Sequence, residues 1–292
     1  MRKARSTQQG TADDGMPAGG AGGKRPGQTA RCAPNATARA GARGAERGDV
    51  AGFLDQLLDA SRFTDYCPNG LQVEGAPRVR RVASAVTASL AAVEQAVALR
   101  ADTLIVHHGW FWRGEDPRVL GTRRARLAEL LANDINLFAY HLPLDAHPEL
   151  GNNAQLAQRL GWTTQGRFAA QGLGSWCDLA RPLSARALAG RVARALGRTP
   201  LAVGRPPAQI HRVAWCTGAA QDMLDEAIAA GAQAFVSGEI SERTTHLARE
   251  AGVLYLAAGH HATERFGVQA LGQRLAAEFG VEHTFIDDPN PA

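Results

Sequence analysis

Residues 82–109 read VASAVTASLAAVEQAVALRADTLIVHHG and set the pattern for most of the chain. The short apolar runs at 82–86 and 103–106 are typical of buried strands. Between them, the apolar residues of AAVEQAVALR recur at helical spacing. The stretch therefore predicts a strand, a helix and a second strand, which is the repeating unit of a sheet covered by helices.

The alternation of strands and helices continues toward the C-terminus. Further strand-like runs lie at 136–140, 213–216, 234–238, 253–258 and 283–287. Amphipathic stretches separate them, and a segment punctuated by Gly and Pro divides the series into two halves. Such alternation predicts an α/β fold in which helices cover the strands.

The two halves contain an internal echo. Aligning the RVA at 81–83 with the RVA at 212–214 sets an offset of 131 residues. This offset places the histidine pair at 107–108 over Gly238 and Glu239. The order of strand and helix matches without a gap, so we expect two α/β halves of related plan, with a different polar group at the equivalent strand end.

The first 48 residues differ in composition from the rest. They are rich in Gly, Ala, Arg, Pro and Thr, and they hold almost no large apolar side chains that could offset the entropy cost of folding. We expect residues 1–48 to be a disordered basic tail. The alternatives are an arginine-rich arm that binds nucleic acid, an organellar transit peptide, or a stretch upstream of the true start codon.

The charge divides near the same boundary. Of 32 basic and 28 acidic residues, nine basic and four acidic ones lie within residues 1–50. The remainder is close to neutral, so its composition does not indicate a nucleic-acid-binding body. The two lysines, Lys3 and Lys24, both lie in the tail, which excludes a Schiff-base or P-loop lysine from the rest.

Cys32, Cys67, Cys177 and Cys216 are far apart in the sequence and form no C-x-x-C pair. This argues against a disulfide framework or a cysteine zinc site, and it predicts a reduced, cytoplasmic protein. No apolar run approaches the ~18–20 residues of a membrane span. The N-terminus also lacks the apolar segment of a secretory signal. We therefore expect no association with a membrane.

Three motifs rich in ligand-type side chains each follow a predicted strand, where open α/β sheets bind their ligands. In the first, TLIVHHGWFW, His107 and His108 end an apolar run. Adjacent strand side chains point to opposite faces, so both imidazoles can reach one site only if the strand ends there. Gly109 permits the required turn.

The second motif, FAYHLPLDAHPELGNN, groups His141, Asp145 and His147 after a predicted strand. Pro143 and Pro148 disfavour an ordinary helix through the motif, so we expect a rigid loop. Imidazole nitrogen combined with a carboxylate suits a divalent cation.

The third motif, YLAAGHHATERFG, predicts a strand, Gly259 and the start of a helix. His260 and Glu264 share one face of that helix, while His261 points elsewhere. Together the motifs supply more ligands than one tetrahedral zinc needs, which suggests two metal ions about 3.5–4 Å apart. The structural alternative is that the histidines only satisfy buried polar groups.

Seven segments together resemble the NIF-three-like family, the dinuclear metal-centre hexameric proteins that carry the name GTP cyclohydrolase 1 type 2 homologue. They are NGLQVEG, IVHHG, ANDINL, YHLPLDAHPELGNNAQLA, VAWCTG, SGEISE and AAGHHATERFG. The resemblance runs from about residue 50 to the C-terminus and is closest to the short, two-domain bacterial type. It implies two divalent ions of zinc, iron, manganese or nickel, with the ligands His107, His108, Asp145, His260 and Glu264. Glu264 would be the bridging carboxylate.

The resemblance also implies the wider organisation of the protein. Two related α/β domains are expected, with the second inserted in the middle of the first. Residues 49–165 plus 245–292 would form the metal-binding domain, and residues 166–244 the inserted one. The subunits would assemble as a toroidal homohexamer with the metal sites facing its cavity. His141 and His246 match further family positions, which implies roles near the metal ligands or on the substrate.

Two neighbouring divalent ions lower the pKa of a bound water and polarise the bond under attack, so hydrolysis is the natural reaction class. With the resemblance, this predicts a hydrolase of a purine nucleotide or related heterocycle. His141 or His246 would be the proton shuttle, and Arg113 an anion contact. Five ligands for two ions leave positions open for water or a small-molecule substrate, which favours catalysis. The alternatives are a non-catalytic metal-binding or metal-delivery protein, or a ring-shaped factor in DNA damage response.

Overall fold

The computed structural model describes residues 44–292, so the predicted tail at residues 1–48 lies outside the described residues except for 44–48. Ala45–Glu46 forms strand β1, which pairs with β3 (Arg78–Val79). Helix α1 (Arg47–Leu57) follows at once. Regular structure thus begins slightly before the boundary predicted at residue 48.

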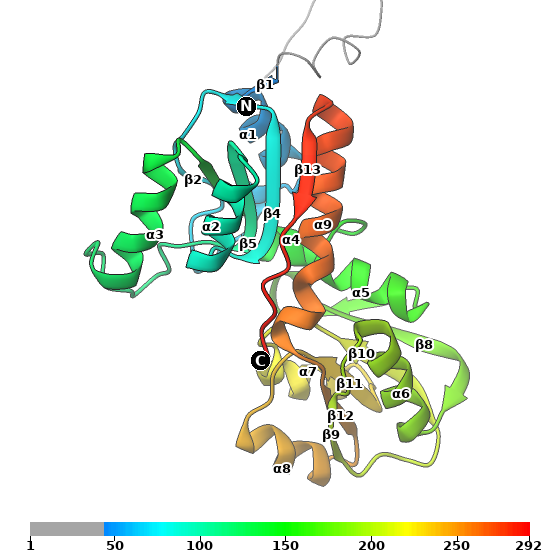
Figure 1. Ribbon diagram of the computed structural model, residues 1–292. Coiled ribbons are helices and arrows are strands. Elements are labelled where there is room, and N and C mark those ends of the chain that lie inside the picture. Colours follow the sequence, from blue (N-terminus) through cyan, green and yellow to red (C-terminus); the bar gives the residue numbers. More distant parts are fainter. Residues whose placement is uncertain (1–43) are drawn as a thin grey trace, which may run out of the picture. The chain divides into compact units, whose positions relative to one another are not determined.

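The first of two larger sheets has five strands in the order β13-β4-β5-β6-β2 (Figure 1). Four of its strands are parallel, and β2 lies antiparallel to β6 at one edge. The strands are β2 (Gly70–Val73), β4 (Arg81–Thr87), β5 (Thr103–His108), β6 (Asn136–Ala139) and β13 (Glu282–Phe285).

Alternate side chains of this sheet face two helical layers. Ala83 and Ala85 of β4 belong to a core with α2 (Leu90–Ala98) and α3 (Gly121–Ala132). Val82 and Val86 belong to the opposite core, which also contains α1 and α9 (His260–Phe279). The period of two along a strand therefore buries both faces, as expected for a mostly parallel sheet.

The second sheet has six strands in the order β7-β8-β10-β11-β12-β9. Its central strands β10, β11 and β12 are parallel, and β8 and β9 are antiparallel to their neighbours. The strands are β7 (Gly166–Phe168), β8 (Gly174–Leu183), β9 (Leu201–Gly204), β10 (Ile210–Trp215), β11 (Ala234–Ser237) and β12 (Leu254–Ala257).

Helices also cover both faces of the six-stranded sheet. One core contains side chains of α5 (Asn152–Leu160) and α6 (Ala185–Leu196). The opposite core contains side chains of α7 (Leu224–Ala229) and α8 (Glu242–Glu250). The predicted inserted domain ends at residue 244, but β12 of this sheet lies after that residue. The six-stranded sheet therefore extends beyond the predicted segment 166–244.

The two sheets repeat one strand register. β4 and β5 pair Val82 with Thr103, and β10 and β11 pair Val213 with Ala234. Both members of the second pair lie 131 residues after those of the first, which is the offset of the internal echo in the sequence. The central strands of the two sheets therefore share a common plan.

Helix α9 connects the two sheets. Two residues separate its start from the end of β12 in the six-stranded sheet, and it packs along β4, β5 and β13 of the five-stranded sheet (Figure 1). The segments that follow β5, β6, β10 and β12 are brought together near the start of α9. No helix in the described part of the chain is long and apolar enough to cross a membrane.

Candidate metal centre

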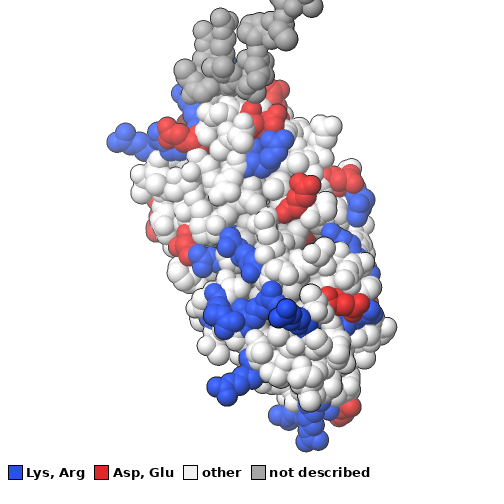
Figure 2. Space-filling view, turned by 90° about the vertical axis from the view of Figure 1, so that its right-hand side faces the viewer, with Lys and Arg blue, Asp and Glu red and all other residues white. Residues whose placement is uncertain are grey.

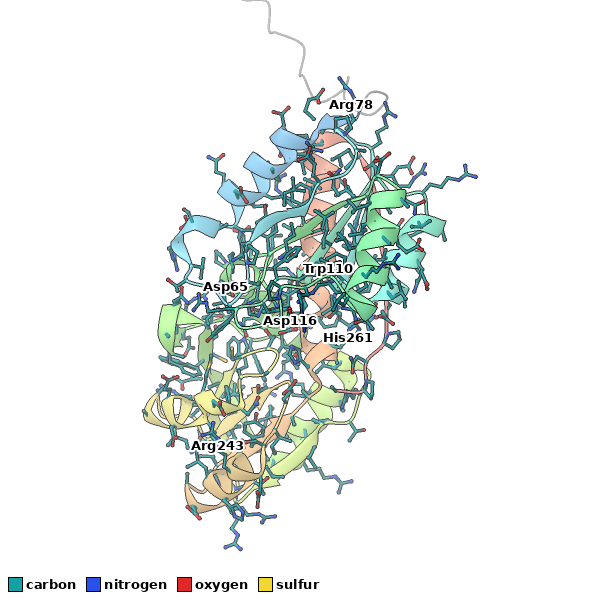
Figure 3. The ribbon with its side chains drawn as sticks, turned by 90° about the vertical axis from the view of Figure 1, so that its left-hand side faces the viewer. Asp65, Arg78, Trp110, Asp116, Arg243 and His261 are labelled. Carbon is teal, nitrogen blue, oxygen red and sulfur yellow. The ribbon has the colours of Figure 1, made fainter. Side chains whose placement is uncertain are left out.

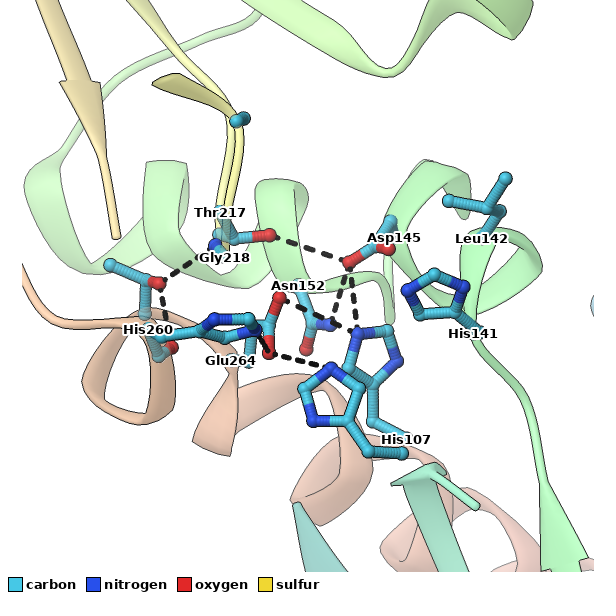
Figure 4. Close-up of polar contacts among 12 residues, drawn as sticks. His107, His141, Leu142, Asp145, Asn152, Thr217, Gly218, His260 and Glu264 are labelled. Atoms are coloured by element: carbon cyan, nitrogen blue, oxygen red, sulfur yellow. Dashed lines mark hydrogen bonds and ion pairs between the residues drawn. The ribbon is translucent and has the colours of Figure 1, made fainter. Parts of the chain in front are cut away.

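The five predicted metal ligands lie in one cluster where the carboxyl ends of both sheets meet (Figure 4). Two groups of potential ligand atoms share Glu264: His107 and Asp145 complete one, and His108 and His260 complete the other. Nε2 of His107 lies 3.5 Å from both Asp145 Oδ1 and Glu264 Oε1. Glu264 Oε2 lies 3.3 Å from His108 Nε2 and 3.0 Å from His260 Nε2. Each oxygen of Glu264 therefore faces a different group.

The histidine pair reaches one site because β5 ends at His108. The ring centroids of His107 and His108 are 4.4 Å apart. The following residue, Gly109, lies so close to β2 and β6 that a Cβ there would come within 2.3 Å of Gln72 Oε1 and 2.4 Å of the Ala139 Cβ. A side chain at this position would push the strand end away from the cluster.

Asp145 is held on a short helix rather than on the rigid loop that the two prolines predict. Helix α4 (Leu142–Ala146) makes one turn, and Pro143 sits in its first positions, where a missing N–H costs no hydrogen bond. Asn152 Nδ2 donates to Asp145 Oδ1 at 2.8 Å, and Thr217 Oγ1 donates to the same oxygen at 3.4 Å. These donors fix the carboxylate.

His147, which the sequence analysis grouped with Asp145, has a different role. Its Nδ1 accepts hydrogen bonds from the backbone N–H groups of Glu149 and Leu150, at 3.1 and 3.0 Å. It belongs to none of the potential metal-binding groups among the described residues. His147 thus organises the turn between α4 and α5.

The three histidines of the cluster and the neighbouring His141 share one arrangement: Nδ1 of each contacts a group outside the cluster. The partners are the Tyr140 carbonyl for His107 at 3.0 Å, Thr87 Oγ1 for His108 at 3.1 Å, Asp65 Oδ1 for His141 at 2.7 Å and Glu239 Oε1 for His260 at 2.7 Å. A carbonyl or carboxylate only accepts, so Nδ1 carries the proton wherever it has such a partner. In the neutral imidazole, Nε2 is then left with a lone pair, as in metal-binding histidines.

Two buried atoms of the cluster lack a hydrogen-bond partner among the described residues, His107 Nε2 and Glu264 Oε2. His107 is fully buried, and Glu264 is 3% exposed. A buried polar atom without a partner carries a desolvation cost of about 1–3 kcal/mol, which a bound cation would remove. The nitrogen and oxygen donors present therefore fit a divalent metal ion.

Electrostatics couple the buried carboxylates to the imidazoles. Burial alone lowers the pKa of His107, but the charges of Asp145 and Glu264 outweigh it and raise that pKa to about 10. Burial alone would also lower the pKa of His260, but its contacts with the Glu264 and Glu239 carboxylates outweigh burial and raise that pKa to about 9. For Glu264, burial raises the pKa but the His107 and His108 imidazoles hold it well below its usual range.

Two further shifts are dominated by burial. It lowers the pKa of His108 to about 3 and raises that of Asp145 above its ordinary value. Outside the ligand cluster, burial raises the pKa of Asp65, but its contacts with His141 and Asn69 bring it down to about 2. Strong opposed shifts within one cluster are typical of functional sites.

His141 and His246, the two predicted proton shuttles, lie in different surroundings. His141 joins His107 and His108 in a third group of potential ligand atoms, and its ring centroid lies 5.0 Å from that of His107. His246 is exposed on α8 and belongs to none of these groups within residues 44–292. Arg113, predicted as an anion contact, is exposed and donates from Nη2 to the Asp65 carbonyl at 2.7 Å.

Several residues around the cluster were not predicted as site residues from the sequence. Asp65 lies in the segment before β2, and Figure 3 labels it at mid-height, toward the left of the view. Trp112 packs edge-on against the His141 ring at a centroid distance of 5.0 Å. The position of Glu239 could have been noticed in the sequence, because the internal echo aligns it with His108. No sequence pattern marks Asp65 or Trp112, because only the fold brings them to His141.

A cavity of about 230 Å³ opens beside the cluster. His141, Asp145, His260 and Glu264 form part of its wall. The rest includes the exposed Tyr66 and apolar side chains, among them Leu142, Leu173 and Met223. A small ligand in this cavity would thus lie directly against the potential metal ligands.

Comparison with known proteins identifies the family. Residues 45–291 match the sequence profile of Duf34/NIF3 (NGG1p interacting factor 3). The chain belongs to the DUF34/NIF3 family. A family relative from Pseudomonas aeruginosa, named GTP cyclohydrolase 1 type 2 homolog, is 56% identical over 246 residues, covering 82% of this chain and 95% of that protein. The Escherichia coli K12 protein of the same name is 51% identical over 241 residues, with coverages of 82% and 97%.

Solved structures agree with this assignment to the DUF34/NIF3 family. Protein ybgI, described as of unknown function, has a TM-score of 0.82 and 49% identity, covering 85% of this chain and all of that one. A protein from Thermus thermophilus has a TM-score of 0.78 and 35% identity, with the same coverages. The mixed α/β fold is thus a feature shared with these proteins.

Proposed function

We propose that this DUF34/NIF3 protein is a hydrolase that uses two divalent metal ions per subunit to attack a purine nucleotide or related heterocycle. One observation carries the proposal: three histidines each place Nε2 within 3.5 Å of the buried Glu264 carboxylate, which two ligand groups share. The name GTP cyclohydrolase 1 type 2 homolog, carried by relatives more than 50% identical, supports the substrate class.

The ligands divide between two positions. His107 and Asp145 would hold one ion and His108 and His260 the other, with Glu264 shared between them. Ions bound here lower the pKa of water and polarise the bond that is cleaved. Asn152 and Thr217 fix Asp145, and Glu239 fixes His260, so the ligands are oriented before any ion binds.

His141 is the residue best placed to move a proton. Asp65 holds its Nδ1, which leaves Nε2 toward His107 and the cavity. His246 stays a prediction that rests on the resemblance alone. The cavity is smaller than the ~300–1,000 Å³ of typical ligand sites, so only the reacting part of a nucleotide would enter it. The apolar wall suits a planar ring.

The wider organisation is also proposed from the family resemblance. We infer two α/β domains, the second inserted in the first, in a toroidal homohexamer located in the cytoplasm. The described cysteines, Cys67, Cys177 and Cys216, are buried and form no disulfide, which is compatible with a reducing compartment.

The decisive measurement is the metal content of freshly purified protein, combined with assays of GTP and cyclic amides after metal reconstitution. We expect two ions per chain in the native protein and loss of both in Glu264→Gln, which keeps the shape of the side chain but removes its charge. Asp145→Asn should lose mainly one. Full retention of both ions in Glu264→Gln would refute the shared carboxylate.

The activity assay separates hydrolysis from the non-catalytic alternatives. A hydrolase should lose turnover in Asp145→Asn, and His141→Gln should retain its metal but turn over slowly. Protein that holds two ions, yet hydrolyses no substrate faster than Asp145→Asn does, would instead be a metal-binding or metal-delivery protein.

A further inference from the structure

A second cavity lies in the six-stranded sheet, away from the metal ligands. Its volume is about 530 Å³, and residues 177–181 and Leu183 of β8 form part of its wall. Strand β7 pairs only with residues 174–176 of β8, so it does not cover this part of the strand. Cys177 in its wall pairs with Val213, whereas the ligand cluster lies beyond the carboxyl end of β10, next to Thr217. The remaining wall comes from the turn after α5 and from α6.

The wall of this cavity carries hydrogen-bond donors that have no partners. Arg181 and Arg191 form no ion pair or side-chain hydrogen bond with any residue in 44–292. Trp162 is only 7% exposed, and its Nε1–H is buried without an acceptor among the described residues. The amide oxygen of Gln165 accepts from the Asp178 N–H, which leaves its NH₂ group to donate.

The local charge is strongly positive although the body as a whole is close to neutral. Residues 179–221 contain seven arginines and no Asp or Glu. Asp178 supplies the carboxylate in the cavity wall. Arg212 donates two hydrogen bonds to it, of 2.7 and 3.1 Å. In Figure 2, which shows the face with α5, α6 and α9, blue side chains gather over the lower half with few red ones. The field at the cavity therefore favours an anion.

Backbone shape lets one of these arginines reach the cavity. Gly161 ends α5 in the left-handed region, with φ 64°, and a Cβ there would come within 2.8 Å of Arg191 Nη2. The missing side chain makes room for the guanidinium. Leu179 and Leu183 add apolar surface to the wall beside the Trp162 ring. The wall thus combines donors for an anion with surface for an organic group.

We propose that this cavity binds an organic phosphate, with its phosphoryl oxygens between Arg181 and Arg191 and its organic part against Trp162 and Leu183. Two guanidiniums with no carboxylate partner suit a group with three terminal oxygens better than a single carboxylate, which one arginine satisfies. The volume lies within the ~300–1,000 Å³ of typical small-molecule sites. This inference does not depend on the metal centre.

Isothermal titration of the full-length protein with inorganic phosphate, adenosine monophosphate and a short single-stranded oligonucleotide tests the proposal. We expect one monophosphate per chain to bind in the native protein and in Glu264→Gln, which removes the metal centre as the binding site. Arg181→Ala and Arg191→Gln should each weaken binding about tenfold or more, as expected for a charge-assisted hydrogen bond. Trp162→Phe, which keeps an aromatic ring but removes the N–H, should weaken it several-fold.

Arg194→Ala is the matched control, because Arg194 is an exposed arginine of α6 that does not line the cavity. It should bind adenosine monophosphate like the native protein. Tight binding of inorganic phosphate alone would identify free phosphate as the ligand and refute the organic group. Failure of both phosphates to bind would overturn the proposal, as would unchanged affinity in both arginine variants of the cavity. An oligonucleotide affinity that Arg194→Ala weakens as much as Arg181→Ala does would also overturn it.

Discussion

The carboxylate of Glu264 is placed by the absence of a side chain opposite it. Gly218 has φ 69°, and a Cβ there would come within 2.1 Å of Glu264 Oε1 and 3.2 Å of His260 Nε2. We expect Gly218→Ala to displace the carboxylate and lower metal affinity at least tenfold, measured as the metal content after dialysis against a competing chelator. The loss follows because both proposed ions use this carboxylate.

A second glycine separates this displacement from backbone strain. Gly197 has nearly the same φ, 68°, but a Cβ there would meet nothing within 4 Å. Both alanine variants should lose about 1–2 kcal/mol of stability through the left-handed backbone. Gly197→Ala should nevertheless keep its full metal content, and equal metal loss in the two variants would contradict the role assigned to Gly218.

The sequence identified the residues of the cluster that sit in recognisable motifs, but not the residues that hold them. His107, His108, His260 and Glu264 follow strands or open a helix at spacings that have a physical meaning. Asp65 lies 76 residues before His141, and nothing local marks it as a hydrogen-bond partner. Long-range partners of this kind depend on strand order, which single-sequence patterns do not encode.

At the scale of elements, the strands with apolar or β-branched runs were predicted and those of the middle segment were not. Strands β7, β8 and β9 and helix α6 all lie between residues 166 and 204, where Gly, Pro and Arg interrupt the pattern. Pro182 is tolerated in β8 because β7 leaves that half of the strand uncovered. The outer strands of the sheet are half-exposed, so their sequences need no continuous apolar run.

The packing of α9 on β13 gives the protein a pH-sensitive contact outside the metal centre. His283 of β13 lies under Gly272 of α9 and contacts Ser84 Oγ at 2.9 Å. Burial lowers the pKa of His283 below its usual 6.5. Below pH 6.5 the unfolded chain therefore takes up a proton that the folded chain does not, and the free energy of unfolding falls as the pH drops toward the folded-state pKa.

Replacing His283 should make the free energy of unfolding depend less steeply on pH. We expect His283→Gln to lose less stability than the native protein between about pH 6.5 and 5, measured by urea unfolding at a series of pH values. His246→Gln, on the exposed face of α8, serves as the control and should follow the native curve. A native slope in His283→Gln would show that other groups carry the acid sensitivity.

At the scale of the whole molecule, Asn153 ties the elements around the metal centre to the six-stranded sheet. It is 2% exposed at the start of α5, and its Oδ1 accepts from the Thr217 N–H at 3.0 Å. Its Nδ2 donates to the carbonyls of Asp145 and Leu173, and its own carbonyl accepts from Trp215 Nε1. One side chain thus joins α4, the segment before β8 and the end of β10.

Asn153→Ala should therefore lower the stability of the described unit as a whole. Buried partners left without hydrogen bonds cost about 1–3 kcal/mol each, so the urea midpoint should fall clearly. The slope of the transition should not change, because α9 contributes Phe266 to a core of the six-stranded sheet and Leu271 to a core of the five-stranded sheet, so that both sheets unfold together. Asn133→Ala, which removes an exposed hydrogen bond to the Glu129 carbonyl, should leave the midpoint nearly unchanged. Two separate transitions in Asn153→Ala would contradict this expectation. They would mean that the two sheets unfold independently once the Asn153 side chain is removed.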